Sequence, residues 1–155
     1  MPDAPYAHIG VLVDDLDAAI ERFSALGLTF MQPRTVEVER LVEGGVEKQI
    51  DLRIAFSHQG PPQWELLEAV GDGVYGAHHG EGLHHVAILA EDPVARRDGL
   101  LQAGFREVGA QYRQDGSIIV SYLDPADLSG IQIELLDAAV QDAIDAWIGG
   151  EDATP

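Results

Sequence analysis

The fold of this chain is decided by two short stretches, HIGVLV at residues 8–13 and HVAILA at residues 85–90. They align at an offset of 77 residues, and the match continues without a gap until Gly27 meets Gly104. Farther along, WELLEA at residues 64–69 resembles IELLDA at residues 133–138, at an offset of 69 residues. Two ordered matches within 155 residues indicate an internal repeat whose second copy has shorter loops.

Each copy of the repeat is predicted to form a strand, a helix and then three strands. Ile9, Val11 and Val13 recur at every second position, which is the period of a strand that buries one face. Asp14 or Asp15 can then cap a helix with one apolar stripe, and Gly27 can end it. The second copy has the equivalent cap, first helical residue and helix end at Asp92, Pro93 and Gly104.

The remaining strands and a last helix follow from periodicity as well. Alternation over residues 50–56 and 118–122 marks one further strand in each copy. Val140, Ile144 and Trp147 then recur at helical spacing, which predicts a short amphipathic helix near the C-terminus. These elements together predict an α+β fold.

The length and hydrophobic content bound the domain organisation. A chain of 155 residues with 46% hydrophobic side chains can build one core without metal or disulfide staples. We expect a single domain over residues 1–150, with the first module at about 6–70, the second at about 83–137 and the C-terminal helix at about 138–148. Residues 151–155 are expected to form a tail.

Charge and composition exclude several classes of partner. The chain has 9 basic and 27 acidic residues, a formal net charge of −18, and no cluster of cations that could neutralise phosphates or a lipid surface. We therefore expect no nucleic-acid and no membrane partner. Because there is no cysteine, any metal must be bound by histidine and carboxylate side chains. Without a signal peptide or an apolar span of about 20 residues, a cytoplasmic location is expected.

Strand alternation places four polar side chains on one face of the predicted sheet. His8 and His85 point away from the apolar residues that pack beneath the helices, and Glu65 and Glu134 do the same in their own strands. Buried carboxylates need a partner, and two carboxylates beside two imidazoles are all satisfied by one divalent cation. The sequence thus predicts a metal site formed by His8, Glu65, His85 and Glu134.

The paired modules resemble the vicinal oxygen chelate superfamily, which includes glyoxalase I, methylmalonyl-CoA epimerase, extradiol dioxygenases and bleomycin or fosfomycin resistance proteins. The resemblance runs from His8 to Asp137, and the phrases GLHHVA at residues 82–87 and ELLE at residues 65–68 are most similar to epimerase-like and glyoxalase-like members. It implies two βαβββ modules that form an incomplete eight-stranded barrel around a divalent metal. The ligand positions of the superfamily fall on the same four residues.

The resemblance also implies a chemistry. We expect a metal-dependent isomerase, epimerase or lyase that transfers a proton next to a chelated carbonyl of a small oxo-acid, thioester or thiol adduct, with Glu134 as the leading base. Mn, Co, Ni or Zn would suit mixed nitrogen and oxygen ligands, and Fe less so. Two alternatives stay open: a metal-free, ligand-sequestering binding protein of the same fold, and an Fe(II) extradiol-type dioxygenase in which Glu65 is not a ligand.

Two further acidic residues are candidates for a second base. Asp51 is a candidate second base if its strand turns that face into the cavity, but an outward face is equally compatible with the pattern. Glu47 is the nearest match to a further epimerase-type base.

His84 is out of phase with His85, so it is placed on the helix side or at the strand edge. A small-molecule substrate is expected, and exposed sheet edges together with the C-terminal apolar stripe favour a homodimer.

Overall fold

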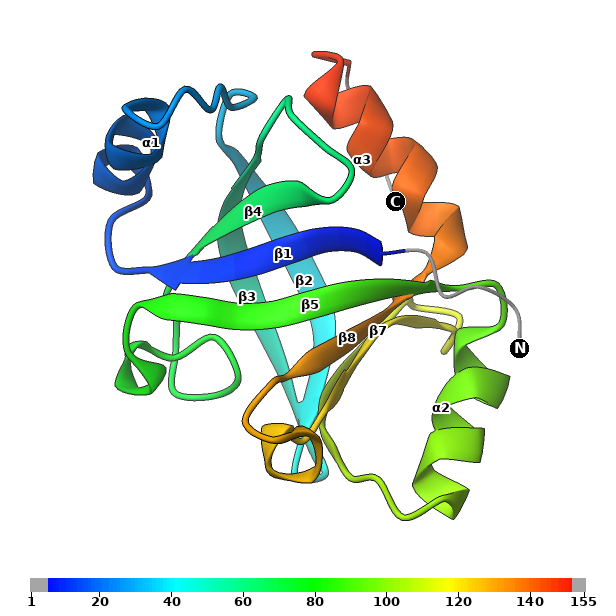
Figure 1. Cartoon of the computed structure of the whole chain (residues 1–155). Coiled ribbons are helices and arrows are strands. Elements are labelled where there is room, and N and C mark those ends of the chain that lie inside the picture. Colours follow the sequence, from blue (N-terminus) through cyan, green and yellow to red (C-terminus); the bar gives the residue numbers. More distant parts are fainter. Residues whose placement is uncertain (1–5, 152–155) are drawn as a thin grey trace.

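The computed structural model describes residues 6–151 (Figure 1). Two βαβββ units follow one another along the chain, as the internal repeat predicts. The first unit consists of β1 (Tyr6–Val13), α1 (Leu16–Ser24), β2 (Arg34–Glu43), β3 (Val46–Phe56) and β4 (Gln63–Glu68). The second consists of β5 (Gly82–Ala90), α2 (Pro93–Gln102), β6 (Glu107–Tyr112), β7 (Ile118–Leu123) and β8 (Ile133–Asp137). The short helix α3 (Gln141–Ile148) ends the fold, and single 3₁₀ turns occur at Ala77–His79, Pro125–Leu128 and Ala138–Val140.

The eight strands form a closed barrel in the order β1-β4-β3-β2-β6-β7-β8-β5. The prediction of an incomplete barrel is therefore wrong. One junction between the modules is the antiparallel pair β1 and β5, and the other is β2 against β6, where Leu41 pairs with Gln111 and Val42 with Ala110. Closure at this second junction depends on long-range pairing that strand periodicity does not encode. Both modules come from one chain.

Helix α1 covers the outer face of the first module. Asp15 accepts a hydrogen bond from the Ala18 N–H and so caps the helix, as predicted. Buried Leu16 and Ala19 pack in one cluster with Val11, Val13, Ala55 and Leu66. This packing places the apolar side of β1 outside the barrel, so the opposite side, which carries His8, faces the interior.

Helix α3 packs against the barrel of its own chain (Figure 1). Val140, Ile144 and Trp147 are all buried in the main core cluster. We expected a homodimer because of open sheet edges and an exposed C-terminal stripe. Neither feature is found among residues 6–151. The oligomeric state itself stays a prediction.

Two sequence expectations concern the ends and the long apolar segments. Residues 152–155 of the expected tail lie outside the described residues, as do residues 1–5. In the described part of the chain, no helix has the length and apolar content needed to cross a membrane.

Candidate metal centre

Four adjacent strands bring the predicted ligands together. Around the barrel β4, β1, β5 and β8 are neighbours, and they carry Glu65, His8, His85 and Glu134 respectively. Gly10 is paired with Glu65 on one side and with His85 on the other, which aligns the two modules at the same height in the barrel. All four ligand candidates are buried, with at most 7% of their surface exposed.

The distances among these side chains fit a shared cation. His8 Nε2 lies 3.0 Å from His85 Nε2, 3.2 Å from a Glu65 oxygen and 3.3 Å from a Glu134 oxygen. His85 Nε2 lies 3.3 Å from Glu65 and 3.4 Å from Glu134. Ligands about 2.1 Å from one ion are about 3.0 Å apart at right angles and about 3.4 Å apart at tetrahedral angles. His8, Glu65 and His85 thus offer one ligand atom each within 4.8 Å of one another, which fits a divalent metal ion of mixed nitrogen and oxygen coordination. Glu134 lies outside this group of three and adjoins it through its contacts with the two imidazoles.

Burial and the neighbouring charges shift the pKa values of the side chains in this cluster. Burial on its own would lower the pKa of His8, but the Glu65 charge and hydrogen bonds with both carboxylates outweigh it and raise the pKa to about 10. Burial opposes ionisation of Glu65, yet the charge and hydrogen bond of His8 lower its pKa to about 2. The pKa of Glu134 is also lowered, against burial, by the neighbouring imidazoles. Both carboxylates are therefore ionised at neutral pH.

Gly10 creates the space in which His85 lies. A Cβ atom built on Gly10 would come within 2.6 Å of His85 Nε2 and closer still to other atoms of the ring. No side chain fits there without displacing the imidazole. The HIG sequence at residues 8–10 thus contributes both a ligand and the gap for a second one.

His84 lies beside His85 in the interior, so its predicted position on the helix side or at the strand edge is wrong. The pairing of β1 with β5 shifts in register between Gly10 and Val11, and this irregularity leaves His84 without a paired residue on β1. Irregularities of this kind redirect a side chain. His84 Nδ1 lies 2.8 Å from His85 Nδ1, and its Nε2 lies 2.7 Å from the Val74 carbonyl oxygen.

Burial and the neighbouring His85 lower the pKa of His84 to about 4, so His84 is neutral at physiological pH. A neutral imidazole has one N–H and one acceptor nitrogen. Since the Val74 carbonyl can only accept, His84 Nε2 donates to it and Nδ1 accepts from His85 Nδ1–H. The His85 ring is consequently oriented so that its Nε2 faces His8, Glu65 and the candidate metal position.

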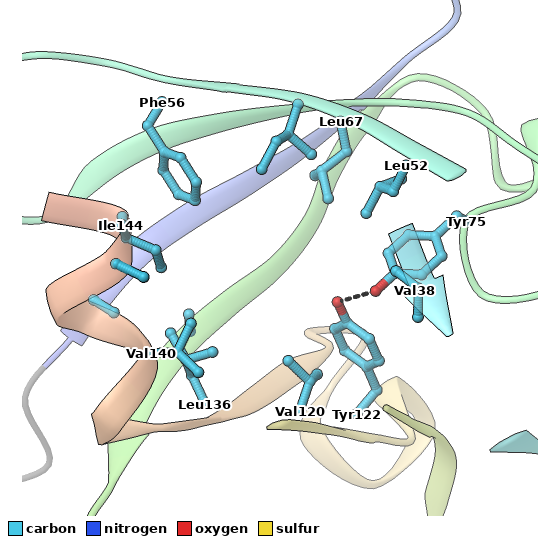
Figure 2. Close-up of a cluster of buried hydrophobic side chains, with 14 of the residues drawn as sticks. Val38, Leu52, Phe56, Leu67, Tyr75, Val120, Tyr122, Leu136, Val140 and Ile144 are labelled. Atoms are coloured by element: carbon cyan, nitrogen blue, oxygen red, sulfur yellow. Dashed lines mark hydrogen bonds between the residues drawn. The ribbon is translucent and has the colours of Figure 1, made fainter. Parts of the chain in front are cut away.

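A pair of phenols extends the polar network. The hydroxyls of Tyr75 and Tyr122 are 2.7 Å apart (Figure 2), and Gln111 donates to the Tyr75 hydroxyl. Burial, followed by the nearby Glu134 carboxylate, raises the pKa of both tyrosines, so both stay protonated. Sequence reasoning placed Tyr122 in an alternating strand without a role. Tyr75 and Gln111 had no signal of their own, because Tyr75 lies in an aperiodic loop.

The metal cluster opens onto an interior cavity of about 530 Å³, within the range typical of small-molecule sites. His8, Glu65 and Glu134 line this cavity together with Tyr75 and Tyr122. The metal position is thus accessible from inside the barrel.

The two further acidic candidates lie elsewhere. Asp51 is exposed on the side of β3 opposite to Leu52 and Ile54, which line the cavity, so the outward alternative describes its position. The Glu47 side chain is 54% exposed and forms an ion pair with Arg40 at 3.1 Å. Neither carboxylate lines the cavity.

Comparison with known proteins assigns the family. The sequence model of the glyoxalase/bleomycin resistance protein/dioxygenase superfamily matches residues 7–122. The chain belongs to this superfamily. Superfamily members commonly bind a divalent metal, and the His and Glu cluster of this chain provides a possible site for one.

Within the superfamily, the chain is similar to methylmalonyl-CoA epimerases. It is 29% identical over 136 residues to the ethylmalonyl-CoA/methylmalonyl-CoA epimerase of Cereibacter sphaeroides, covering 83% of this chain and 93% of that relative. Among solved structures, a Streptomyces coelicolor methylmalonyl-CoA epimerase in complex with 2-nitronate-propionyl-CoA has a TM-score of 0.63 and 26% identity, covering 88% and 96% of the two chains. A hypothetical protein from Bacillus halodurans C-125 shares the fold, with a TM-score of 0.65, 20% identity, and 87% and 94% coverage.

Proposed function

We propose that this protein is a metal-dependent epimerase or isomerase that moves a proton on the carbon next to a carbonyl group. The observation that carries the proposal is the position of Glu134, which is one of four buried ligand candidates and also lines the cavity. Its similarity to methylmalonyl-CoA epimerases supports the same reaction class.

His8, Glu65, His85 and Glu134 would hold the ion. When bound, a divalent ion polarises a carbonyl group and stabilises the negative charge that develops on its oxygen. Mn, Co, Ni or Zn would suit these mixed nitrogen and oxygen ligands, and the chain has no thiolate that would favour Zn.

Glu134 is the base in this proposal. Its lowered pKa keeps the carboxylate ionised at neutral pH, and its place in the cavity wall brings it within reach of a bound substrate. Tyr122 and Tyr75 keep their protons, so neither phenol competes for the proton that moves. One of the two O–H groups donates to the other hydroxyl.

Epimerisation needs a second group that returns the proton to the opposite face of the carbon. Glu65 supplies the other carboxylate of the cavity wall, across the His8 imidazole from Glu134. Because Asp51 and Glu47 lie outside the cavity, we assign the second role to Glu65. If Glu65 serves only to bind the ion, Glu134 on its own supports isomerisation.

Solvent deuterium exchange tests the proposal. Metal-loaded protein is incubated in D₂O with a panel of 2-oxo acids and acyl thioesters, and exchange at the carbon next to the carbonyl is followed by NMR. Glu134→Gln preserves the shape of the side chain but removes its basicity, so exchange is expected to fall by about 10² to 10⁴. Glu21→Gln, the same change on the exposed face of α1, is the matched control.

Two outcomes would contradict the proposal. Wild-type protein that contains metal and exchanges no deuterium into any compound is not an enzyme of this class. Glu134→Gln protein that keeps both its metal content and its exchange rate shows that another group is the base.

A further inference from the structure

The cavity has a polar end and an apolar body. At the polar end are the metal cluster and the Tyr75–Tyr122 pair. The body is surrounded by aliphatic and aromatic side chains that project from several strands toward a common space, as Figure 2 shows for Leu52, Phe56, Val120 and Leu136. A ligand that reaches from the metal position into the body therefore passes from a polar to an apolar environment.

The C-terminal segment forms one wall of this body. Val140, Ile144 and Trp147 line the cavity, and each is at most 6% exposed to solvent. Together with Phe56 and Leu136 they offer hydrocarbon and ring surface but no charged group (Figure 2). Surface of this kind binds apolar groups and gives nothing to a charged or strongly hydrated one.

The rim of the cavity does not favour a polyanion. Glu37 and Glu39 line it with exposed carboxylates. Of the two arginines that line it, Arg113 forms an ion pair with Asp137 at 2.8 Å and Arg34 lies over the Trp147 ring, 4.8 Å from its centroid. With a formal net charge of −18 on the whole chain, the potential at this opening opposes a tail that carries several phosphates.

We infer that the substrate combines a metal-chelating oxygen head group with an uncharged, apolar tail that fills the body of the cavity. Val140, Ile144 and Trp147 determine which tails fit. This inference rests on the proposed function only for the placement of the head group, and it distinguishes the chain from relatives whose names specify CoA esters.

A series of 2-oxo acids of increasing length tests the inference with wild-type protein. Binding to Co²⁺-loaded protein is measured by calorimetry for 2-oxobutanoate, 2-oxohexanoate and 2-oxooctanoate, which share one head group. Each fully buried methylene is expected to raise the affinity about fourfold, so burial of two of the four additional methylenes already makes 2-oxooctanoate bind at least about tenfold more tightly than 2-oxobutanoate. Affinities that do not depend on chain length would overturn the inference. So would a CoA thioester that binds more tightly than 2-oxooctanoate.

A matched pair of variants on α3 locates the tail. Ile144 lines this cavity, whereas Ile148 on the same helix does not. Ile144→Ala is expected to weaken binding of 2-oxooctanoate roughly tenfold and to leave binding of 2-oxobutanoate within about twofold. Ile148→Ala should change neither. Equal effects of both variants would place the tail elsewhere, and the wild-type series remains decisive if a variant does not fold.

The same samples separate the inference from the proposed function. Deuterium exchange is recorded alongside binding for each acid. Binding that strengthens with chain length but is never accompanied by exchange supports the cavity assignment and rejects the enzyme, leaving a binding protein for apolar oxo compounds. Deuterium exchange together with affinities that do not depend on chain length supports the proposed enzyme and rejects the cavity assignment.

Discussion

At the scale of single residues, the orientation of His85 depends on a histidine that does not itself reach the metal position. His84 is neutral because of its burial, and its single N–H is used by the Val74 carbonyl. The remaining lone pair therefore accepts from the Nδ1–H of His85 and orients that ring. Partners of this kind hold a ligand ready for the metal, so the ligand does not have to reorganise when the metal binds.

His84→Ala tests this role. Without its partner, His85 can adopt the other tautomer, and metal affinity is expected to fall about 10- to 100-fold. Calorimetric titration with Zn²⁺ measures the change, and His79→Ala in the exposed 3₁₀ turn is the control. If the variant loses thermal stability in the metal-free state but keeps the wild-type affinity, His84 has a packing role only.

Metal binding should also depend on pH through His8. In the metal-free protein the pKa of His8 is raised to about 10, so the imidazole carries a proton at neutral pH and must release it to bind an ion. Affinity is therefore expected to rise up to about tenfold per pH unit between pH 6.5 and 8.5. Calorimetry in two buffers of different ionisation enthalpy should detect release of about one proton. His8→Gln should abolish most of this dependence, and a pH-independent wild-type affinity would contradict the assignment.

At the scale of elements, the β1–β5 junction determines whether the two histidines can meet. Strand β1 has a glycine where β5 presents the His85 ring, and the adjacent shift in register turns His84 inward. The two strands belong to different modules, so this junction both helps to close the barrel and brings together two of the candidate ligands. We therefore expect packing at Gly10 to affect metal binding.

Gly10→Ala is expected to lower the free energy of unfolding by about 1 to 3 kcal/mol, because the added methyl overlaps the His85 ring and the core cannot accommodate it. Metal affinity should fall with it. Gly99→Ala is a control of opposite sign: Gly99 lies in exposed α2 with no atom within 4 Å of the added Cβ. That change should stabilise the protein by about 0.5 to 1 kcal/mol. Urea unfolding measures both, and a neutral Gly10→Ala variant would mean that His85 can move without cost.

The sequence was sufficient for features that depend on local periodicity. Alternation in β1 and β5 predicted that His8 and His85 face away from the apolar residues beneath the helices, and the repeat predicted the succession of one strand, one helix and three strands along each half of the chain. It could not reveal His84, whose position depends on a register irregularity, or Tyr75, which lies in a loop without periodicity. Barrel closure between β2 and β6 also escaped prediction, because a short long-range junction leaves no local pattern.

At the scale of the whole molecule, the two modules share one site. The first module contributes His8 and Glu65 to the proposed site, and the second contributes His85 and Glu134, so neither module has all of the proposed ligands. The two junctions of the closed barrel also join the modules through continuous sheet. Binding of an ion therefore stabilises the association of the modules, and the modules should unfold together rather than in sequence.

Thermal unfolding tests this coupling. Metal-free protein should unfold in a single transition, and a divalent ion at 100 times its dissociation constant should stabilise it by about 2.7 kcal/mol, which corresponds to roughly 5 to 10 °C for a chain of this length. The His8→Ala, His85→Ala double variant removes one ligand from each module and should lose both the shift and the bound metal, as elemental analysis would show. A shift that persists in the double variant would place the ion elsewhere. Two separate transitions in the wild-type protein would instead show that the modules are stable independently, despite the closed barrel.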